Sequence, residues 1–209
     1  MNCGKGNRLN ARFCDGCGTK LINREIDPVC ELFVGREKEL NSITQAINDA
    51  SSGRGRIVLL SGEAGIGKTS TAEIAIELST SRGFKAYSCY CHEAAGAPPF
   101  WPWIQLLRSW LENCSDEEIE ALPAENQGAI AELIPELLTK LPQKPSVITD
   151  INDEVARFKL FDAITNLWLS ASQFQPLVLV FDDLQWADTS SLKLLEFFAR
   201  EVEKKQFCL

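Results

Sequence analysis

Short apolar runs alternate with amphipathic segments along most of the chain. Leu40, Ile43 and Ile47 recur at helical spacing. The run Ile57-Val58-Leu59-Leu60 follows a Gly/Arg turn at 53–56 and predicts a buried strand. Because strands and helices alternate from here on, the pattern predicts an α/β fold with a parallel sheet. The further predicted elements are a helix carrying Ile74, Ile76 and Leu78, strands at about 84–91 and 177–181, and a helix from about 189.

A long insertion separates the second predicted strand from the third. Its roughly 85 residues have mostly helical patterns, and two apolar stripes at helical spacing lie within it. Core packing explains such stripes best, and a ligand cage is the alternative. The stripes are Trp103, Leu106, Leu107, Trp110 and Leu111, followed by Phe158, Phe161, Ile164 and Trp168.

The acidic charge is concentrated in one part of this insertion. The 209 residues carry 29 acidic and 21 basic side chains, which gives a net charge of −8. Residues 111–139 hold eight of the carboxylates and no Lys or Arg, so the rest of the chain balances at 21 to 21. This charge argues against direct nucleic-acid binding. The acidic stretch is best explained as a solvated helix surface, with docking of a basic partner as the alternative.

Nothing in the chain predicts a membrane segment or secretion. No apolar run approaches the ~18 residues that a membrane helix needs, and Met1 opens a polar stretch. We therefore expect a cytoplasmic protein, in which eight scattered cysteines favour reduced thiols or metal ligands over disulfides. Cys89 and Cys91, beside His92, alternate along a predicted strand, which favours core packing over a metal site.

Residues 1–24 differ from the rest and predict a small zinc-ribbon-like module. They hold three cysteines, four glycines and five basic residues, and they are too few to build a core of their own. Cys14 and Cys17 have the spacing of a zinc knuckle, and Cys3 is the third candidate ligand for Zn²⁺. A disordered cysteine-rich tail, or a zinc site damaged by truncation, is the alternative. We expect a linker at 25–32 and a second domain at 33–209.

A glycine-rich segment stands between the first predicted strand and the next helix. Its sequence, Gly62-Glu63-Ala64-Gly65-Ile66-Gly67-Lys68-Thr69, fits the G-x-x-x-x-G-K-[ST] pattern of a phosphate-binding loop, and Ser70 follows it. Glycines let successive backbone N–H groups point at an anion, and the helix adds its positive N-terminal end. Lys68 would reach the β- and γ-phosphates of ATP, and the Thr69 hydroxyl would ligate Mg²⁺. The alternative is a glycine-rich turn with an exposed lysine.

Two carboxylates end the third predicted strand. A phosphate-binding loop needs a carboxylate at the end of a neighbouring buried strand to hold the metal's water shell, and Asp182 is the candidate for this Mg²⁺ site. Asp183 is placed to polarise an attacking water. The alternative is a solvated acidic turn in which Asp188 caps the next helix.

These segments resemble the AAA/STAND-type signalling ATPase domains of large bacterial transcriptional regulators and multidomain nucleotide cyclases. The resemblance implies a P-loop parallel sheet with helices on both faces, a slow ATP-dependent switch, and sensor or output domains in the same or a partner chain. It places Arg36 near the adenine, with a surface arginine as the alternative, and it allows a nucleotide-dependent oligomer. The residues that carry it are Phe33 to Glu37, the P-loop, Gly96-Ala97-Pro98-Pro99-Phe100-Trp101-Pro102-Trp103 and Phe181-Asp182-Asp183-Leu184-Gln185-Trp186-Ala187-Asp188.

The resemblance also implies that the sheet is incomplete at the C-terminus. In such folds the strand after the Asp-Asp strand lies between it and the P-loop strand, and residues 206–209 do not continue the family's pattern. Without that strand, backbone groups lack partners, and we do not expect Asp182 to be held against Thr69. Sensor, arginine-finger and lid regions are missing as well, so we expect a fragment or a truncated product.

Three functions remain open from the sequence. The leading hypothesis is an ATP-binding switch module that hydrolyses ATP only in a complete fold. The second is a zinc-ribbon interaction protein with a degenerate ATPase half, and the third is a non-functional truncated product. Neither a DNA-binding helix-turn-helix nor a cyclase segment is visible, so no output is assigned.

Overall fold

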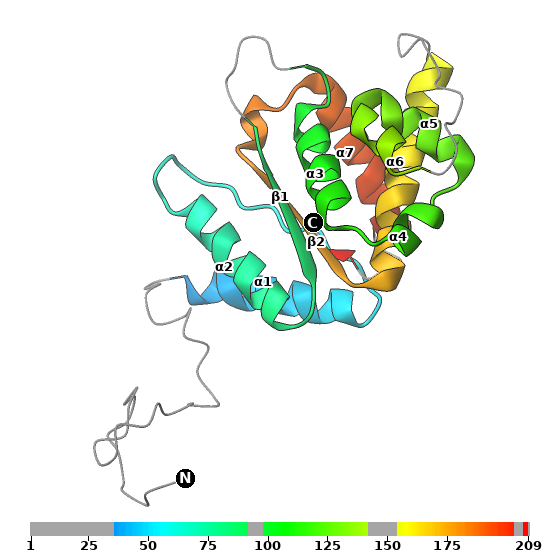
Figure 1. Ribbon diagram of the computed structural model, residues 1–209. Helices are drawn as coiled ribbons and strands as arrows, with labels where there is room; N and C mark the ends of the chain where they lie inside the picture. Colours follow the sequence, from blue (N-terminus) through cyan, green and yellow to red (C-terminus); the bar gives the residue numbers. More distant parts are fainter. Residues whose placement is uncertain (1–35, 92–97, 142–153, 203–206, 209) are drawn as a thin grey trace, which may run out of the picture. The chain divides into compact units, whose positions relative to one another are not determined.

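A small parallel sheet organises the larger of the two units into which the chain divides, Lys38–Leu209. The computed structural model describes residues 36–91, 98–141, 154–202 and 207–208, nearly all of them in this unit. The elements are α1 (Glu37–Ser51), α2 (Lys68–Ser81), β1 (Lys85–Tyr90), α3 (Trp101–Asn113), α4 (Asp116–Glu120), α5 (Ala124–Leu133), η2 (Pro135–Thr139), α6 (Glu154–Phe174), β2 (Leu177–Asp182), η3 (Leu184–Trp186), α7 (Thr189–Val202) and β3 (Phe207–Cys208) (Figure 1).

β1 and β2 form the main ladder of the sheet. They run parallel in register from Lys85 opposite Leu177 to Tyr90 opposite Asp182. β3 adds to the other edge of β2, so the strand order is β1-β2-β3. The predicted parallel sheet, with strands at about 84–91 and 177–181, is thus confirmed.

β3 bears on the expectation that residues 206–209 do not continue the family's pattern. Phe207 and Cys208 pair with Leu177 and Val178 of β2. They lie on the edge of β2 opposite β1, which is where the resemblance places the strand after the Asp-Asp strand. β3 therefore forms two pairs at the place of that strand.

Residues 57–60 are not part of the sheet, and the prediction of a buried strand there is wrong. The segment pairs with none of the described strands. Ile57 and Leu59 are 49% and 77% exposed, whereas Val58 and Leu60 are half-buried. A strand needs a neighbour for its backbone groups, and on this side of β2 the described chain offers only the two residues of β3.

The period-two alternation of β2 sorts its side chains between two layers. Leu177, Leu179 and Phe181 contact the aromatic core on one face. Val178 and Val180 belong to the other face, which α2 covers. Asp182, the next residue in this series, therefore lies on the side of α2.

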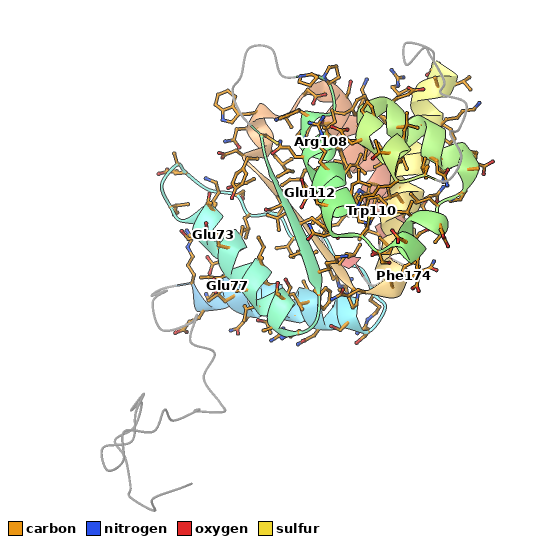
Figure 2. All side chains as sticks on the ribbon, in the orientation of Figure 1. Glu73, Glu77, Arg108, Trp110, Glu112 and Phe174 are labelled. Carbon is orange, nitrogen blue, oxygen red and sulfur yellow. The ribbon has the colours of Figure 1, made fainter. Side chains whose placement is uncertain are left out.

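Helices cover both faces of the sheet. Figure 1 shows α1 and α2 on one side and α3, α6 and α7 on the other. On α2, Ile74 and Leu78 are buried, whereas Glu73 and Glu77 lie on its outer face one turn apart (Figure 2). This amphipathic spacing explains how a helix that begins at the phosphate-binding loop packs along the sheet.

The aromatic stripes of the insertion form the largest hydrophobic core. Trp103, Trp110 and Trp168 are at most 1% exposed, and they pack between β1, α3, α6 and α7. Core packing is thus confirmed for these stripes, except that Phe158 is 59% exposed. Neither α6, with 21 residues, nor any other helix in the described ranges is long and apolar enough to cross a membrane.

The acidic stretch is mostly a solvated surface, as predicted. Glu118 is the exception, because it is buried and its carboxylate accepts from the Ser115 backbone N–H at 2.8 Å in a capping box that starts α4. The ammonium of Lys85 at the start of β1 lies 3.5 Å from the same carboxylate. One acidic side chain thus fixes a helix start beside the sheet.

A substitution at Gly55 tests how tightly the turn at 53–56 packs on the end of α7. A Cβ added at Gly55 would lie 1.9 Å from the backbone oxygen of Val202, so backbone has to move. We predict that Gly55→Ala lowers the free energy of unfolding by about 1–3 kcal/mol. Gly53→Asn is the control, because Gly53 has open space and a φ of +82° that Asn tolerates. Equal unfolding midpoints in urea for Gly55→Ala and the parent would contradict this packing.

Candidate functional site

The glycine-rich segment forms a loop that leads directly into α2. Gly65 and Gly67 have φ values of +77° and +91°, which other residues adopt only with strain. Gly67 caps α2, and no acidic side chain lies in the first turn of the helix. The positive end of α2 is therefore available to an anion held by the loop.

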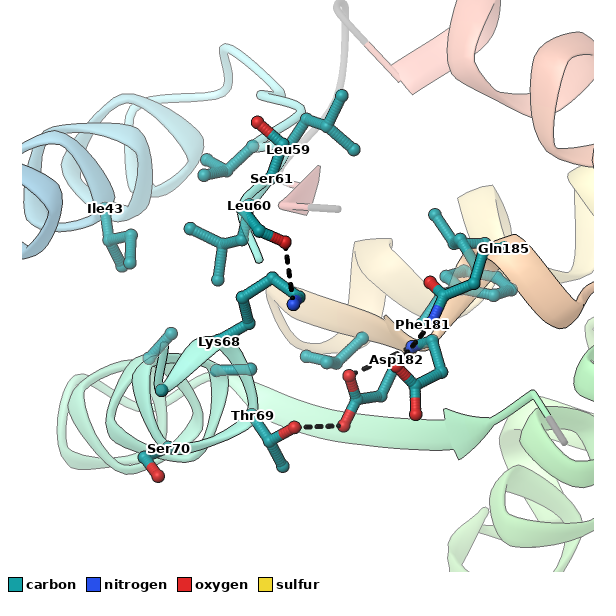
Figure 3. Close-up of a pocket in the computed structure, with 18 of the residues that line it drawn as sticks. Ile43, Leu59, Leu60, Ser61, Lys68, Thr69, Ser70, Phe181, Asp182 and Gln185 are labelled. Carbon is teal, nitrogen blue, oxygen red and sulfur yellow. Dashed lines mark hydrogen bonds between the residues drawn. The ribbon is translucent and has the colours of Figure 1, made fainter. Parts of the chain in front are cut away.

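Lys68 folds back over this loop. Its ammonium donates to the backbone oxygens of Gly62 and Glu63, both at 3.0 Å. Figure 3 shows the Lys68 side chain with one of these bonds. An ammonium has three N–H donors. Two carbonyl oxygens of the loop thus accept from the ammonium, at a place where phosphate oxygens could accept instead.

Thr69 contacts Asp182 directly. The Thr69 hydroxyl donates to Oδ2 of Asp182 at 2.9 Å, which joins residues 113 positions apart (Figure 3). Without the central strand we did not expect this contact, so that expectation was wrong. The reason is that α2 packs on both β1 and β2, and this packing brings the start of α2 to the end of β2.

A strained turn follows Asp182. The backbone N–H of Asp183 donates to Oδ1 of Asp182 at 3.0 Å, and Asp183 itself has a φ of +58°. This left-handed conformation is uncommon for a residue with a Cβ, although Asp tolerates it better than most. The amide of Gln185 donates to Oδ1 of Asp183 at 2.9 Å and so fixes the second carboxylate. Sequence analysis missed Gln185, although its place two residues after Asp183 suits such a local contact.

A groove of about 860 Å³ connects these groups. One end is polar and contains Lys68, Thr69 and Asp182. The rest is apolar and is lined by Ile43 and Ile47 of α1 and by residues of α2, β2 and 58–60. Its volume is in the range of small-molecule sites. The contribution of α1 was not predicted, because a helix stripe alone does not say which surface it covers.

The carboxylates also affect a neighbouring thiol. The backbone N–H of Cys91 donates to the Asp182 carbonyl oxygen at 3.0 Å, and the Cys91 side chain is 3% exposed. Burial raises the pKa of this thiol to about 11, with a further contribution from Asp188, Asp183 and Asp182. Cys89, which is fully buried, also has a raised pKa because of burial. Core packing of both cysteines is thus confirmed.

Some predicted site residues are not placed by this geometry. Arg36 precedes α1 and is half-buried, and its position beside adenine stays a prediction. Cys3, Cys14 and Cys17 lie outside the described residues. Within residues 36–91, 98–141, 154–202 and 207–208, no group of three or more His, Cys, Asp or Glu side chains could hold a metal ion.

Comparison with known proteins decides the family. The sequence profile described as "AAA ATPase domain" matches residues 32–209, which is most of the chain. The chain belongs to this family. The AAA ATPase domain assignment agrees with the mixed α/β fold and implies nucleotide binding, with ATP and Mg²⁺ as the ligands.

A curated relative adds a broader context. This AAA ATPase domain is 31% identical over 183 residues to hybrid signal transduction histidine kinase G of Dictyostelium discoideum. The match covers 79% of this chain and 5% of the relative, so the chain spans a small part of that protein. No solved structure matches the chain significantly.

The Cys91 thiol beside the site provides a test of its electrostatics. Because its pKa is about 11, we predict that at pH 8 it alkylates with iodoacetamide at least about a hundredfold more slowly than in the unfolded AAA ATPase domain. Mass spectrometry of the Cys91 peptide after timed labelling would measure both rates. Equal rates in native and guanidinium-unfolded protein would refute the buried, carboxylate-flanked position.

Proposed function

We propose that this domain is an ATP-binding switch module of a signalling protein and that it holds Mg-ATP at the P-loop. The observation that carries the proposal is the 2.9 Å contact between Thr69 and Asp182. It joins the first turn of α2 to the end of β2, and these are the two places that a nucleotide site with a metal requires. The AAA ATPase family match supports the choice of ATP.

The phosphates would bind to the loop and to the start of α2. Backbone N–H groups from Gly62 to Thr69, and that of Ser70, are the donors we assign to this role. Lys68 would exchange its two loop carbonyl partners for phosphate oxygens, which carry a full charge and form stronger hydrogen bonds. The groove behind the loop is large enough for the rest of a nucleotide.

The residues beside the P-loop fit a magnesium ion. Mg²⁺ prefers oxygen ligands, and the Thr69 hydroxyl and the Asp182 carboxylate provide two kinds of oxygen at one place. Bound there, the ion would neutralise charge on the phosphates. Thr69 and Asp182 would hold it, directly or through its waters.

Asp183 is the residue we assign to hydrolysis. Its carboxylate is exposed, adjoins Asp182 and is held by Gln185. A carboxylate in this position accepts a hydrogen bond from a water and orients it toward a γ-phosphate. Hydrolysis would be slow and would need the sensor and arginine-finger regions of a complete fold.

The place of the module in signalling rests on the relative and on the resemblance. The relative's name describes a hybrid signal transduction histidine kinase, which supports a role between an input and an output domain. We propose that the bound nucleotide sets the state of the module and that domains in the same or a partner chain respond to it.

Lys68→Ala tests the nucleotide site. Removing a charged donor to phosphate should weaken ATP binding about 10- to 100-fold, since such hydrogen bonds contribute ~1.5–3 kcal/mol. Isothermal titration of the purified chain with Mg-ATP would measure it. Lys193→Ala on the exposed face of α7 is the matched control and should bind as the parent does. Equal affinity of the parent and Lys68→Ala would refute the site.

The N-terminal cysteines support a separate proposal. We propose that residues 1–24 form a zinc-binding module, with Cys3, Cys14 and Cys17 as ligands, that residues 25–32 link it to the ATPase domain, and that the domain begins near residue 33. The spacing of Cys14 and Cys17 suits one tetrahedral Zn²⁺.

Metal analysis tests this module. We expect one zinc per chain, and we expect the double variant Cys14→Ser/Cys17→Ser to lose it while the unfolding midpoint of the ATPase domain stays the same. Cys114→Ser, which changes a cysteine outside the module, should retain the metal. A zinc-free parent protein, prepared without chelators, would show that no such module exists.

A further inference from the structure

Two distant sequence segments meet at the carboxylate of Asp188. One is the Pro-rich segment that leads into α3 at Trp101, and the other is the turn from β2 into α7. Oδ2 of Asp188 accepts from the backbone N–H of Phe100 at 3.2 Å. Phe100 caps α3 with a φ of +65°, an uncommon value for a bulky residue, so this contact holds a strained position.

The two oxygens of Asp188 have separate tasks. Oδ1 accepts from the backbone N–H groups of Ser190 and Ser191, at 3.0 and 2.9 Å, and thereby caps α7. Oδ2 accepts from Phe100 and from the Ser191 hydroxyl. The cap, which the sequence analysis gave as part of the alternative to the metal site, is thus formed. The bond to Phe100 is additional, and a helix cap does not require it.

Contacts of Trp103 connect the start of α3 with the candidate nucleotide site. Trp103, in the first turn of α3, donates its indole N–H to the Ser191 carbonyl oxygen at 3.1 Å. Its ring packs against the ring of Phe181 with 5.0 Å between centroids. Phe181 directly precedes Asp182, so the start of α3 is braced against the metal-binding end of β2.

We propose that Asp188 is a positioning residue for Asp182 and Asp183. Its Oδ2 ties the start of α3 to the start of α7, and the Trp103–Phe181 contact transmits this constraint to the end of β2. The bond between Phe100 and Asp188 thereby keeps the carboxylates of Asp182 and Asp183 in place for the metal ion and for a water. The proposal rests on the proposed ATP site only for its nucleotide readout.

The substitution Asp188→Asn separates the bond from Phe100 from the N-terminal cap of α7. Asn is as good a helix cap as Asp, so its amide oxygen replaces Oδ1. Its NH₂ group replaces Oδ2 and cannot accept from Phe100. Asp188→Ala removes both functions, and Ser191→Ala is the matched control that removes one bond to Oδ2 but keeps the bond from Phe100.

Hydrogen exchange of the nucleotide-free protein is the first measurement. In Asp188→Asn we expect faster exchange in peptides covering 100–104 and 181–186, with exchange at 190–195 unchanged. Asp188→Ala should accelerate exchange in all three regions. Ser191→Ala should leave exchange at 100–104 and 181–186 unchanged. If Asp188→Asn leaves residues 181–186 as protected as in the parent, the positioning role is overturned whether or not ATP binds.

Nucleotide affinity with and without Mg²⁺ is the second measurement. We expect Asp188→Asn to weaken Mg-ATP binding about 3- to 10-fold and ATP binding in EDTA less than about twofold, as a milder version of Asp182→Asn. Equal weakening in both conditions would indicate a purely structural role and overturn the proposal. A parent chain that binds no ATP would refute the proposed function, and the exchange data would still decide the role of Asp188.

Discussion

β1 and β2 share six paired residues, and this ladder determines where the other elements meet. Parallel pairing from Lys85 and Leu177 onward puts both carboxyl ends at the same edge of the sheet. The alternation of side chains then directs Phe181 toward the aromatic core and Asp182 toward α2. A shift of one residue in this register would exchange the two faces and bury a carboxylate among tryptophans.

Much of the fold follows from local patterns in the sequence. The amphipathic spacing of α2, the apolar run of β2 and the two aromatic stripes are each determined by neighbouring residues, and each occurs in the structure. The segment 57–60 has an equally apolar run, yet it is not a strand. Its conformation depends on a pairing partner from elsewhere in the chain, and a local pattern does not contain that information.

The candidate site is likewise only partly predictable from the sequence. General rules place the phosphate-binding loop and a carboxylate at the end of a buried strand at one edge of a parallel sheet. The direct contact of Thr69 with Asp182 was not predicted, because it depends on the packing of α2 against β1 and β2. The left-handed conformations of Phe100 and Asp183 have no such signal, since neither is glycine. The bond from Phe100 to Asp188 is therefore visible only in three dimensions, whereas the place of Gln185 two residues after Asp183 suits a local contact. What the sequence cannot predict here is the strain and the contacts that hold it.

The edge of β2 opposite β1 has a consequence for the protein in solution. Beyond Val178, no described strand pairs with this edge. The run from Leu177 to Phe181 contains neither lysine nor proline, the residues that oppose pairing with a strand of another molecule. Such an edge is a template for strands of other molecules. The net charge of −8 opposes that encounter through mutual repulsion, which salt screens. Repulsion between acidic surfaces, that of the insertion included, therefore opposes such pairing most at low ionic strength.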